Sequence, residues 1–70
     1  MKEIELLKQP VELYKILKFE GLADSGGAAK SAIADGLVLV NGRIETRKRR
    51  KIVTGDIIEV GEDQFRVTLK

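Results

Sequence analysis

Residues 20–42 read EGLADSGGAAKSAIADGLVLVNG, and this stretch predicts the end of one helix, the whole of a second and the start of a hairpin. Gly21 suits the left-handed residue that commonly follows a helix, with Leu22 folding back as the hydrophobic contact of that end. Asp24 and Ser25 are both good N-caps for the second helix, which we expect to end at Gly36. Its buried face would consist of Ala29, Ala32 and Ile33.

The segment before Gly21 predicts a first helix. Gln9 and Pro10 open it, because proline is preorganised for the first helical position. Apolar residues then recur at helical spacing at Leu13, Ile16 and Leu17. Nearer the N-terminus, residues 3–7 could form an additional strand or an irregular segment, and their pattern does not decide between the two.

From residue 37 onward the hydrophobic period changes from that of a helix to that of a strand. Residues 37–40 form a short apolar run, Asn41-Gly42 is the strongest two-residue hairpin signal, and residues 43–46 supply the return strand. Ile52 and Val53 lead into a turn at residues 54–56. Residues 57–60 and 65–69 predict two more strands, joined through residues 61–63.

Helices followed by strands predict an α+β fold, with two short helices packed on one face of a small, mostly antiparallel sheet. Seventy residues can close only a single core, so we expect one domain over residues 1–70. Phe19 and Phe65 are predicted to lie in the core, whereas the pattern leaves Tyr14 undecided. The rest of the predicted core is aliphatic and consists of Leu13, Ile16, Leu17, Leu22, Ala29, Ala32, Ile33, Val38, Val40, Ile52, Ile57 and Val60.

Positive charge is concentrated in one segment. Residues 43–51, RIETRKRRK, hold six cations against Glu45 and therefore carry a net charge of +5, and we call residues 47–51 the basic loop. Since the whole chain carries +2, the other 61 residues sum to −3. An acidic body with one strongly basic segment is typical of a contact surface for a polyanion, although a solvated loop is the simpler alternative. The candidate phosphate ligands in this segment are Arg43, Arg47, Lys48, Arg49, Arg50 and Lys51.

The start of the second helix, Ser25-Gly26-Gly27, is a second candidate contact. Each glycine in a helix is unfavourable by about 1 kcal/mol relative to alanine, so two in succession require an explanation. One explanation is that free backbone amides and the positive end of the helix dipole bind a phosphate there, with Lys30 adding a charge to the same anion. The other is a tight bend between the helices that needs glycine, and the sequence alone does not separate the two.

The residue types argue against catalysis. The chain has neither histidine nor cysteine, and Ser25 has no evident base to activate it, so we expect no enzyme activity, no metal and no cofactor. The N-terminal residues MKEIELLKQP contain no uninterrupted hydrophobic run. Neither a secretory signal nor a membrane span is therefore expected, and the cytoplasm is the expected location.

In combination, these features resemble the RNA-binding domain named after the small-subunit ribosomal protein S-four, also called the alpha-L RNA-binding motif. The resemblance covers residues 11–60 and is nearest to the small stand-alone bacterial members. It implies two helices packed against a small sheet, with RNA contact along the start of the second helix and the neighbouring loops. The matching features are EGLADSG, Ala29-Lys30, Ile33 with Asp35-Gly36, LVLVNG, Val53-Thr54-Gly55-Asp56, Ile58 and Val60.

The resemblance also implies contact residues by position. Those on the helix side are Ser25, Gly27 and Lys30, and those at the hairpin beside it are Asn41, Gly42 and Arg43. Many members of the family have arginine directly after the helix-start serine, where this chain has Gly26. We hypothesise that the enlarged basic loop replaces that phosphate contact.

We therefore expect a monomeric, cytoplasmic module that binds structured RNA, with ribosomal and transfer RNA as candidates and the ribosome as one possible site of action. Aromatic residues number only three, which favours recognition of folded RNA by shape and phosphate over the reading of unpaired bases. Two alternatives stay open. The basic loop could meet an acidic protein partner, or it could bind duplex DNA, because phosphate contacts alone do not separate RNA from DNA.

Overall fold

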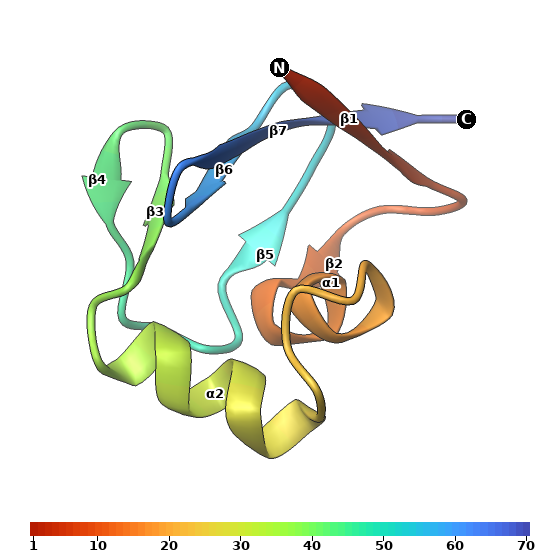
Figure 1. The fold of residues 1–70 in the computed structure, drawn as a ribbon. Helices are drawn as coiled ribbons and strands as arrows, with labels where there is room; N and C mark the ends of the chain where they lie inside the picture. The colour runs from red at the N-terminus through yellow and green to blue at the C-terminus, as the bar shows by residue number, and fades with distance from the viewer.

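A computed structural model of residues 1–70 contains two helices and seven strands. In chain order they are β1 (Lys2–Leu6), β2 (Val11–Glu12), α1 (Leu13–Phe19), α2 (Gly26–Ala34), β3 (Val38–Val40), β4 (Arg43–Ile44), β5 (Lys51–Ile52), β6 (Ile57–Val60) and β7 (Asp63–Leu69). Figure 1 shows the two helices in contact with each other below the strands. The α+β fold predicted from the sequence is confirmed.

Five strands form one sheet in the order β1-β7-β6-β3-β4, and β2 pairs with β5 in a separate two-stranded ladder. All pairs are antiparallel except β1 with β7, where Ile4 lies opposite Val67 and Leu6 opposite Leu69. The N-terminal segment is therefore an edge strand. It belongs to the core as well, because Ile4 and Leu6 are both buried.

The core is one cluster of thirteen buried apolar side chains contributed by both helices and by the strands. The prediction of Ile57 as a core residue is wrong, since it is only half-buried and its neighbour Ile58 takes that place. Ile58 lies opposite Val40 and Phe65, and successive side chains of a strand point to opposite faces, so Ile57 faces away from the helices. The other predicted members that are only partly buried are Leu22, Ala32 and Val60.

The two phenylalanines lie in different environments. Phe65 is buried, as predicted, whereas Phe19 is 72% exposed, so the prediction that Phe19 lies in the core is wrong. Helix α1 buries the stripe formed by Leu13, Ile16 and Leu17. At 3.6 residues per turn, position 19 falls outside that stripe.

Helix α1 begins later than the sequence pattern predicts. The Gln9-Pro10 peptide bond is cis, and Val11 and Glu12 are extended and pair with β5. Pro10 is therefore not the first helical residue. The reason is the β2–β5 ladder, which keeps the chain extended up to Glu12.

Both helices end at the glycines that predict their ends. Gly21 has a φ of +72°, and its N–H donates to the carbonyl oxygen of Lys18 at 3.2 Å. The N–H of Leu22 reaches back to the carbonyl oxygen of Leu17 at 2.9 Å, which completes a Schellman motif. Gly36, with a φ of +78°, closes α2 with the same pattern.

No side chain caps the start of α1. Instead, the N–H of Leu13 donates to the carbonyl oxygen of Arg50 at 2.9 Å, and the N–H of Tyr14 donates to that of Lys48 at 3.1 Å. The basic loop thereby satisfies two of the donors that every helix start leaves free. These bonds hold the loop against the start of α1, and Figure 1 shows the chain between β4 and β5 passing beside the helices.

Glu45, which precedes the basic loop in the chain, holds the loop from its buried side. It is buried, and its carboxylate accepts bonds from the backbone N–H of Arg47 at 3.0 Å, from Nε and Nη2 of Arg47 at 3.1 and 3.0 Å, and from Nη1 of Arg50 at 2.9 Å. The bonds from Arg47 outweigh the effect of burial and lower the pKa of Glu45 to about 2. The same pair raises the pKa of Arg47.

We expect this ion cluster to make the fold sensitive to acid. Because the folded pKa of Glu45 lies below its ordinary value of 4.5, its contribution to stability is fully present above about pH 5 and is lost as the pH falls toward about 2. At neutral pH, Glu45→Gln should lower the free energy of unfolding by about 2 kcal/mol. Thermal denaturation over this pH range measures the difference between the two proteins.

The difference in unfolding free energy between the wild type and Glu45→Gln should narrow as the pH falls. Protonation of Glu45 in acid removes from the wild type the same ion pairs that the substitution has already removed. Glu62→Gln is the matched control, since Glu62 is exposed and forms no ion pair. A difference that stays constant from neutral to acid pH would contradict this role of Glu45.

Candidate nucleic-acid interface

The start of α2 presents two unused backbone donors. Ser25 is the N-cap, as predicted, and its Oγ accepts a hydrogen bond from the N–H of Ala28 at 3.1 Å. The N–H groups of Gly26 and Gly27 have no acceptor in the fold. Together with the positive end of the helix dipole, they can bind an anion.

The fold itself does not require glycine at either position. Gly26 and Gly27 lack the positive φ that Gly21 has, so any residue could adopt their backbone conformation. A Cβ added there would lie 4.0 Å from Cε2 of Tyr14 or 3.8 Å from Oγ of Ser25, and both are ordinary contacts. The explanation by a tight bend therefore loses its basis. A methyl group at either position would instead hinder the close approach of a ligand to the N–H groups of Gly26 and Gly27.

Tyr14 connects the start of α2 with the basic loop. The centre of its ring lies 4.6 Å from Nζ of Lys30, 5.7 Å from Cζ of Arg49 and 6.0 Å from Nζ of Lys15. These cations come from α2, the basic loop and α1, and all lie within the range of cation–π attraction. The helix start and the basic loop therefore belong to one surface.

The basic loop supplies the rest of the positive charge. Arg47 and Arg50 share the carboxylate of Glu45, so this carboxylate can neutralise only one of their two charges. Lys48 and Lys51 form no ion pair in the fold. The loop forms a shallow, open depression without hydrophobic residues, lined by Arg47, Arg49, Arg50 and Lys51.

Glu12 is a second carboxylate at the edge of this surface. It pairs with Nζ of Lys15 at 3.2 Å and with Nη1 of Arg49 at 3.4 Å. The hydrogen bond from Lys15, assisted by the charges of Arg49 and Lys51, lowers the pKa of Glu12 below its ordinary value. Through these two ion pairs, Glu12 holds Arg49 beside α1.

The hairpin residues Asn41, Gly42 and Arg43 do not join this surface. Asn41 and Gly42 form the predicted two-residue turn of the β3–β4 hairpin, with φ of +54° and +83°. The Asn41 side chain serves the fold, because its Nδ2 donates to Asp56 and its Oδ1 accepts from the N–H of Ile57. Strand β3 leads away from the helices, and Figure 1 shows the turn far from the start of α2. The expectation that the hairpin lies beside the helix start is therefore wrong.

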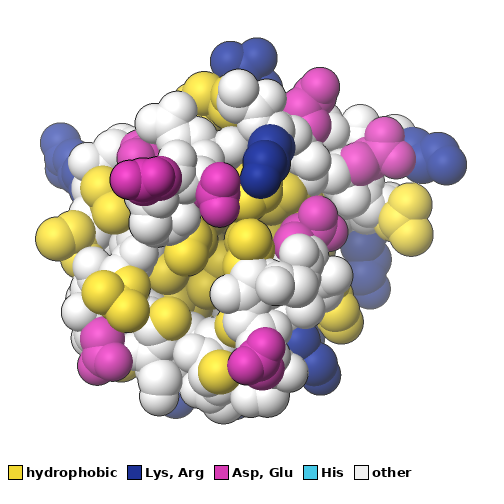
Figure 2. All heavy atoms as spheres, viewed as in Figure 1, with side chains coloured by type: hydrophobic (Ala, Val, Ile, Leu, Met, Phe, Trp, Pro, Cys, Tyr) yellow, Lys and Arg dark blue, Asp and Glu magenta, His cyan; other side chains and the backbone are white.

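The cations are unevenly distributed over the molecule. Figure 2 shows a face with carboxylates around an apolar hollow, and most of the Lys and Arg side chains in that view lie at its outline.

No group of three or more acidic side chains could hold a metal ion. The helices, of seven and nine residues, are too short to cross a bilayer.

Three residues of the positive surface, Glu12, Tyr14 and Lys15, were not among the predicted site residues. Glu12 and Lys15 are spaced for a helical ion pair, and this signal was available in the sequence. Tyr14 offers no such signal, because two of its cation neighbours come from segments far along the chain. Only the packing of α1 against α2 and the loop brings them to its ring.

Comparison with known proteins finds a matching family and similar proteins in other organisms. A family model of the S4 domain matches residues 4–68. In Escherichia coli (strain K12), the protein named "Putative RNA-binding protein YbcJ" is 52% identical over 59 residues, which cover 83% of this chain and 84% of that protein. In Bacillus subtilis (strain 168), the "Probable ribosome maturation protein RlbA" is 34% identical over 65 residues, which cover 91% and 92% of the two chains.

A solved structure shares the fold as well. The solution structure of YbcJ from E. coli, described as revealing an alpha-L motif involved in RNA binding, superposes with a TM-score of 0.72 at 46% identity. The superposition covers 97% of this chain and 87% of that one. The family match extends beyond the predicted motif of residues 11–60 and takes in most of β1 and β7. The chain therefore belongs to the S4-domain family, and its two helices and mostly antiparallel sheet are the alpha-L fold.

Proposed function

We propose that this protein binds structured RNA through the start of α2, the basic loop and the cations around Tyr14. The observation that carries the proposal is the meeting of Lys30, Arg49 and Lys15 around one ring, beside the free N–H groups of α2. Clustered cations release the counterions of a phosphate chain, and backbone N–H groups add directional bonds to phosphate oxygens. Both are found on this one surface.

The relatives support RNA as the polyanion. The name and the solved structure of YbcJ refer to RNA binding, and the name of RlbA refers to ribosome maturation. We propose ribosomal RNA as the first candidate, bound by a monomer in the cytoplasm, and a function that consists of binding without turnover. Cations contributed by separate segments suit the phosphates of a folded RNA better than one extended strand.

Removal of single cations from this surface should weaken the attraction between the protein and the RNA phosphates. If the wild type contacts about four to seven phosphates, the log-log slope of affinity on salt is on the order of −3 to −6. Lys30→Ala and Lys48→Ala should each lower the affinity and reduce the steepness of the slope by about 1. Anisotropy titrations of a labelled RNA hairpin at several salt concentrations measure both quantities.

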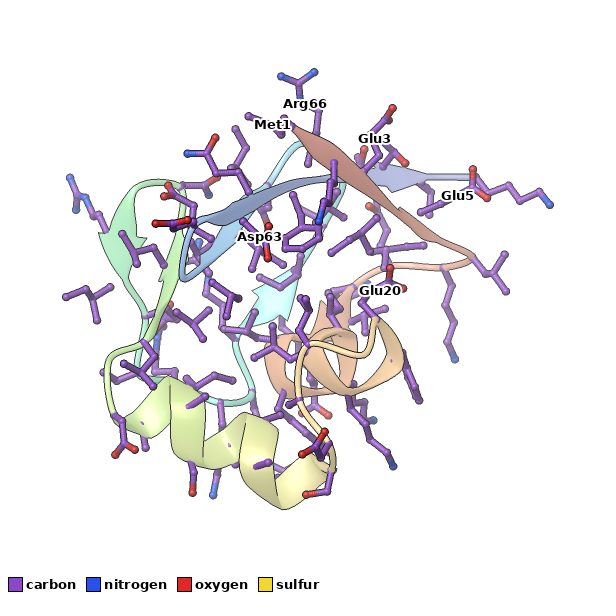
Figure 3. All side chains as sticks on the ribbon, viewed as in Figure 1. Met1, Glu3, Glu5, Glu20, Asp63 and Arg66 are labelled. Carbon is purple, nitrogen blue, oxygen red and sulfur yellow. The ribbon has the colours of Figure 1, made fainter.

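Arg66→Ala is the matched control, because it removes the same charge at the far side of the molecule from α2 (Figure 3). A nearly flat slope, or an equal loss of affinity in Arg66→Ala, would count against the proposed binding surface.

Duplex DNA of equal length should compete poorly with the RNA, since A-form shape and the 2′-hydroxyl distinguish RNA from DNA. Equal competition would favour the DNA-binding alternative.

Gly27→Ala should separate stability from binding. Alanine relieves the cost of glycine in a helix, so the free energy of unfolding should rise by about 0.5–1 kcal/mol. The added methyl group lies beside the free N–H groups and should lower the affinity for the RNA hairpin. Thermal denaturation and anisotropy of one sample report both effects. A variant that is more stable and binds RNA equally well would show that the N–H groups make no contact.

Tyr14→Leu should loosen the cation cluster, whereas Tyr14→Phe should preserve it, because the cations use the ring face and not the hydroxyl group. Since leucine has no ring face to attract Lys30 and Arg49, we expect RNA affinity to fall about 3- to 10-fold in the leucine variant. Circular dichroism checks that both variants fold. Equal affinities of the two folded variants would remove Tyr14 from the proposed surface.

A further inference from the structure

We propose that a cleft between β1 and α1, directly beside the basic loop, holds one unpaired nucleobase of the bound RNA. This inference rests on the proposed function and adds to it a site for a base, distinct from the phosphate contacts. Three observations carry it: the exposure of Phe19, the continuity of the cleft with the basic loop, and the placement of carboxylates and cations along its walls.

The cleft has a volume of about 670 Å³, which lies in the range of sites for small organic ligands. One wall is formed by β1 and the connection that follows it, and the other by α1. Two large apolar side chains on these walls are left in water, Leu7 with 81% and Phe19 with 72% of its surface exposed. Exposed apolar side chains at one groove suit a ligand with an apolar face, and a phenylalanine ring can stack on any base.

The cleft opens onto the basic loop. Lys51 lines both the cleft and the basic depression, so the two are contiguous. Lys15 lines the cleft and also lies at the ring of Tyr14. Glu12, in the cleft wall, binds both Lys15 and Arg49. A nucleotide whose phosphate rests on the loop therefore has the cleft within reach of its base.

The charged groups of the cleft favour a base inside and a phosphate outside. Glu5 and Glu20 line it without an ion pair, and Figure 3 shows the Glu20 side chain pointing from the end of α1 toward the side of β1. Free carboxylates repel phosphate but accept hydrogen bonds from the amino groups of a base. Lys8, Lys15 and Lys51, also in the lining, can hold the flanking phosphates.

A protein strand fits this site less well than a nucleotide. β1 is an edge strand, and edge strands can pair with another chain. A second copy that paired antiparallel about Ile4 would place Glu3 of one chain opposite Glu5 of the other, and like charges directly opposite are destabilising. The continuity with the basic loop favours a segment of the same RNA.

The test compares labelled RNA hairpins with a fully paired stem and with a single bulged nucleotide, in a series that covers all four bases. Wild-type protein should bind at least one bulged hairpin about 5- to 150-fold more tightly than the paired one, the range expected for stacking of one base. Phe19→Ser should abolish this preference, but keep the affinity for the paired hairpin and its salt slope. Phe19→Tyr, which retains a ring, should keep the preference.

The other outcomes separate this inference from the proposed function. If the wild type binds paired and bulged hairpins equally, with a steep salt slope, the base site is wrong and the phosphate surface stands. If no hairpin binds in a salt-dependent way, the proposed function fails as well. Because Phe19 is exposed, its variants should melt like the wild type, and a drop in melting temperature would instead show that its role is structural.

A cross-linking experiment identifies the occupant of the cleft in the cell. Phe19→benzoylphenylalanine places a photoreactive group on the cleft wall, and irradiation should join the protein to RNA at a nucleotide outside a base-paired stem. Cross-links to protein alone, or to paired nucleotides alone, would overturn the inference.

Discussion

Two backbone hydrogen bonds at the start of α1 underlie the whole candidate surface. The N–H groups of Leu13 and Tyr14 donate to the carbonyl oxygens of Arg50 and Lys48, and no side chain takes their place. Leaving either N–H group without an acceptor would destabilise the fold by about 1–3 kcal/mol. The start of α1 and the basic loop therefore stabilise each other. Because the bonds are made by the backbone, the side chains of Arg47, Lys48, Arg49 and Lys51 remain exposed, where a polyanion can reach them. Arg50 is half-buried beside Glu45.

Holding many cations in one place requires interactions that offset their repulsion. Glu45 supplies one on the buried side of the loop, Glu12 supplies another at its edge, and the ring of Tyr14 supplies a third between Lys30 and Arg49. None of these groups neutralises the surface, which keeps unpaired lysines. They arrange it before any ligand arrives, and such preorganisation lowers the conformational entropy that binding would otherwise lose.

Local sequence patterns predicted the parts of the fold that local physics decides. The helix ends at Gly21 and Gly36 and the N-cap at Ser25 follow from positive φ and side-chain capping, which few residues can provide. Local patterns gave a wrong prediction, or none, where pairing between strands determines the structure. Pro10 suits a helix start, but pairing of the next two residues with β5 delays the helix. β1 joins the sheet only because β7, from the other end of the chain, lies beside it.

The sequence by itself determined the α+β class, the family, the concentration of charge in residues 43–51 and the glycine-opened start of α2, because each follows from the residue types and their order along the chain. Tertiary structure alone decided which of these features share a surface. In the folded chain, Lys30 and Arg49 lie at the ring of Tyr14, and the hairpin turn lies far from the start of α2. Phe19 lies exposed at a cleft beside the loop. The physical reason is that these contacts join residues distant in the chain, whose distances are set by packing of the core and by strand register.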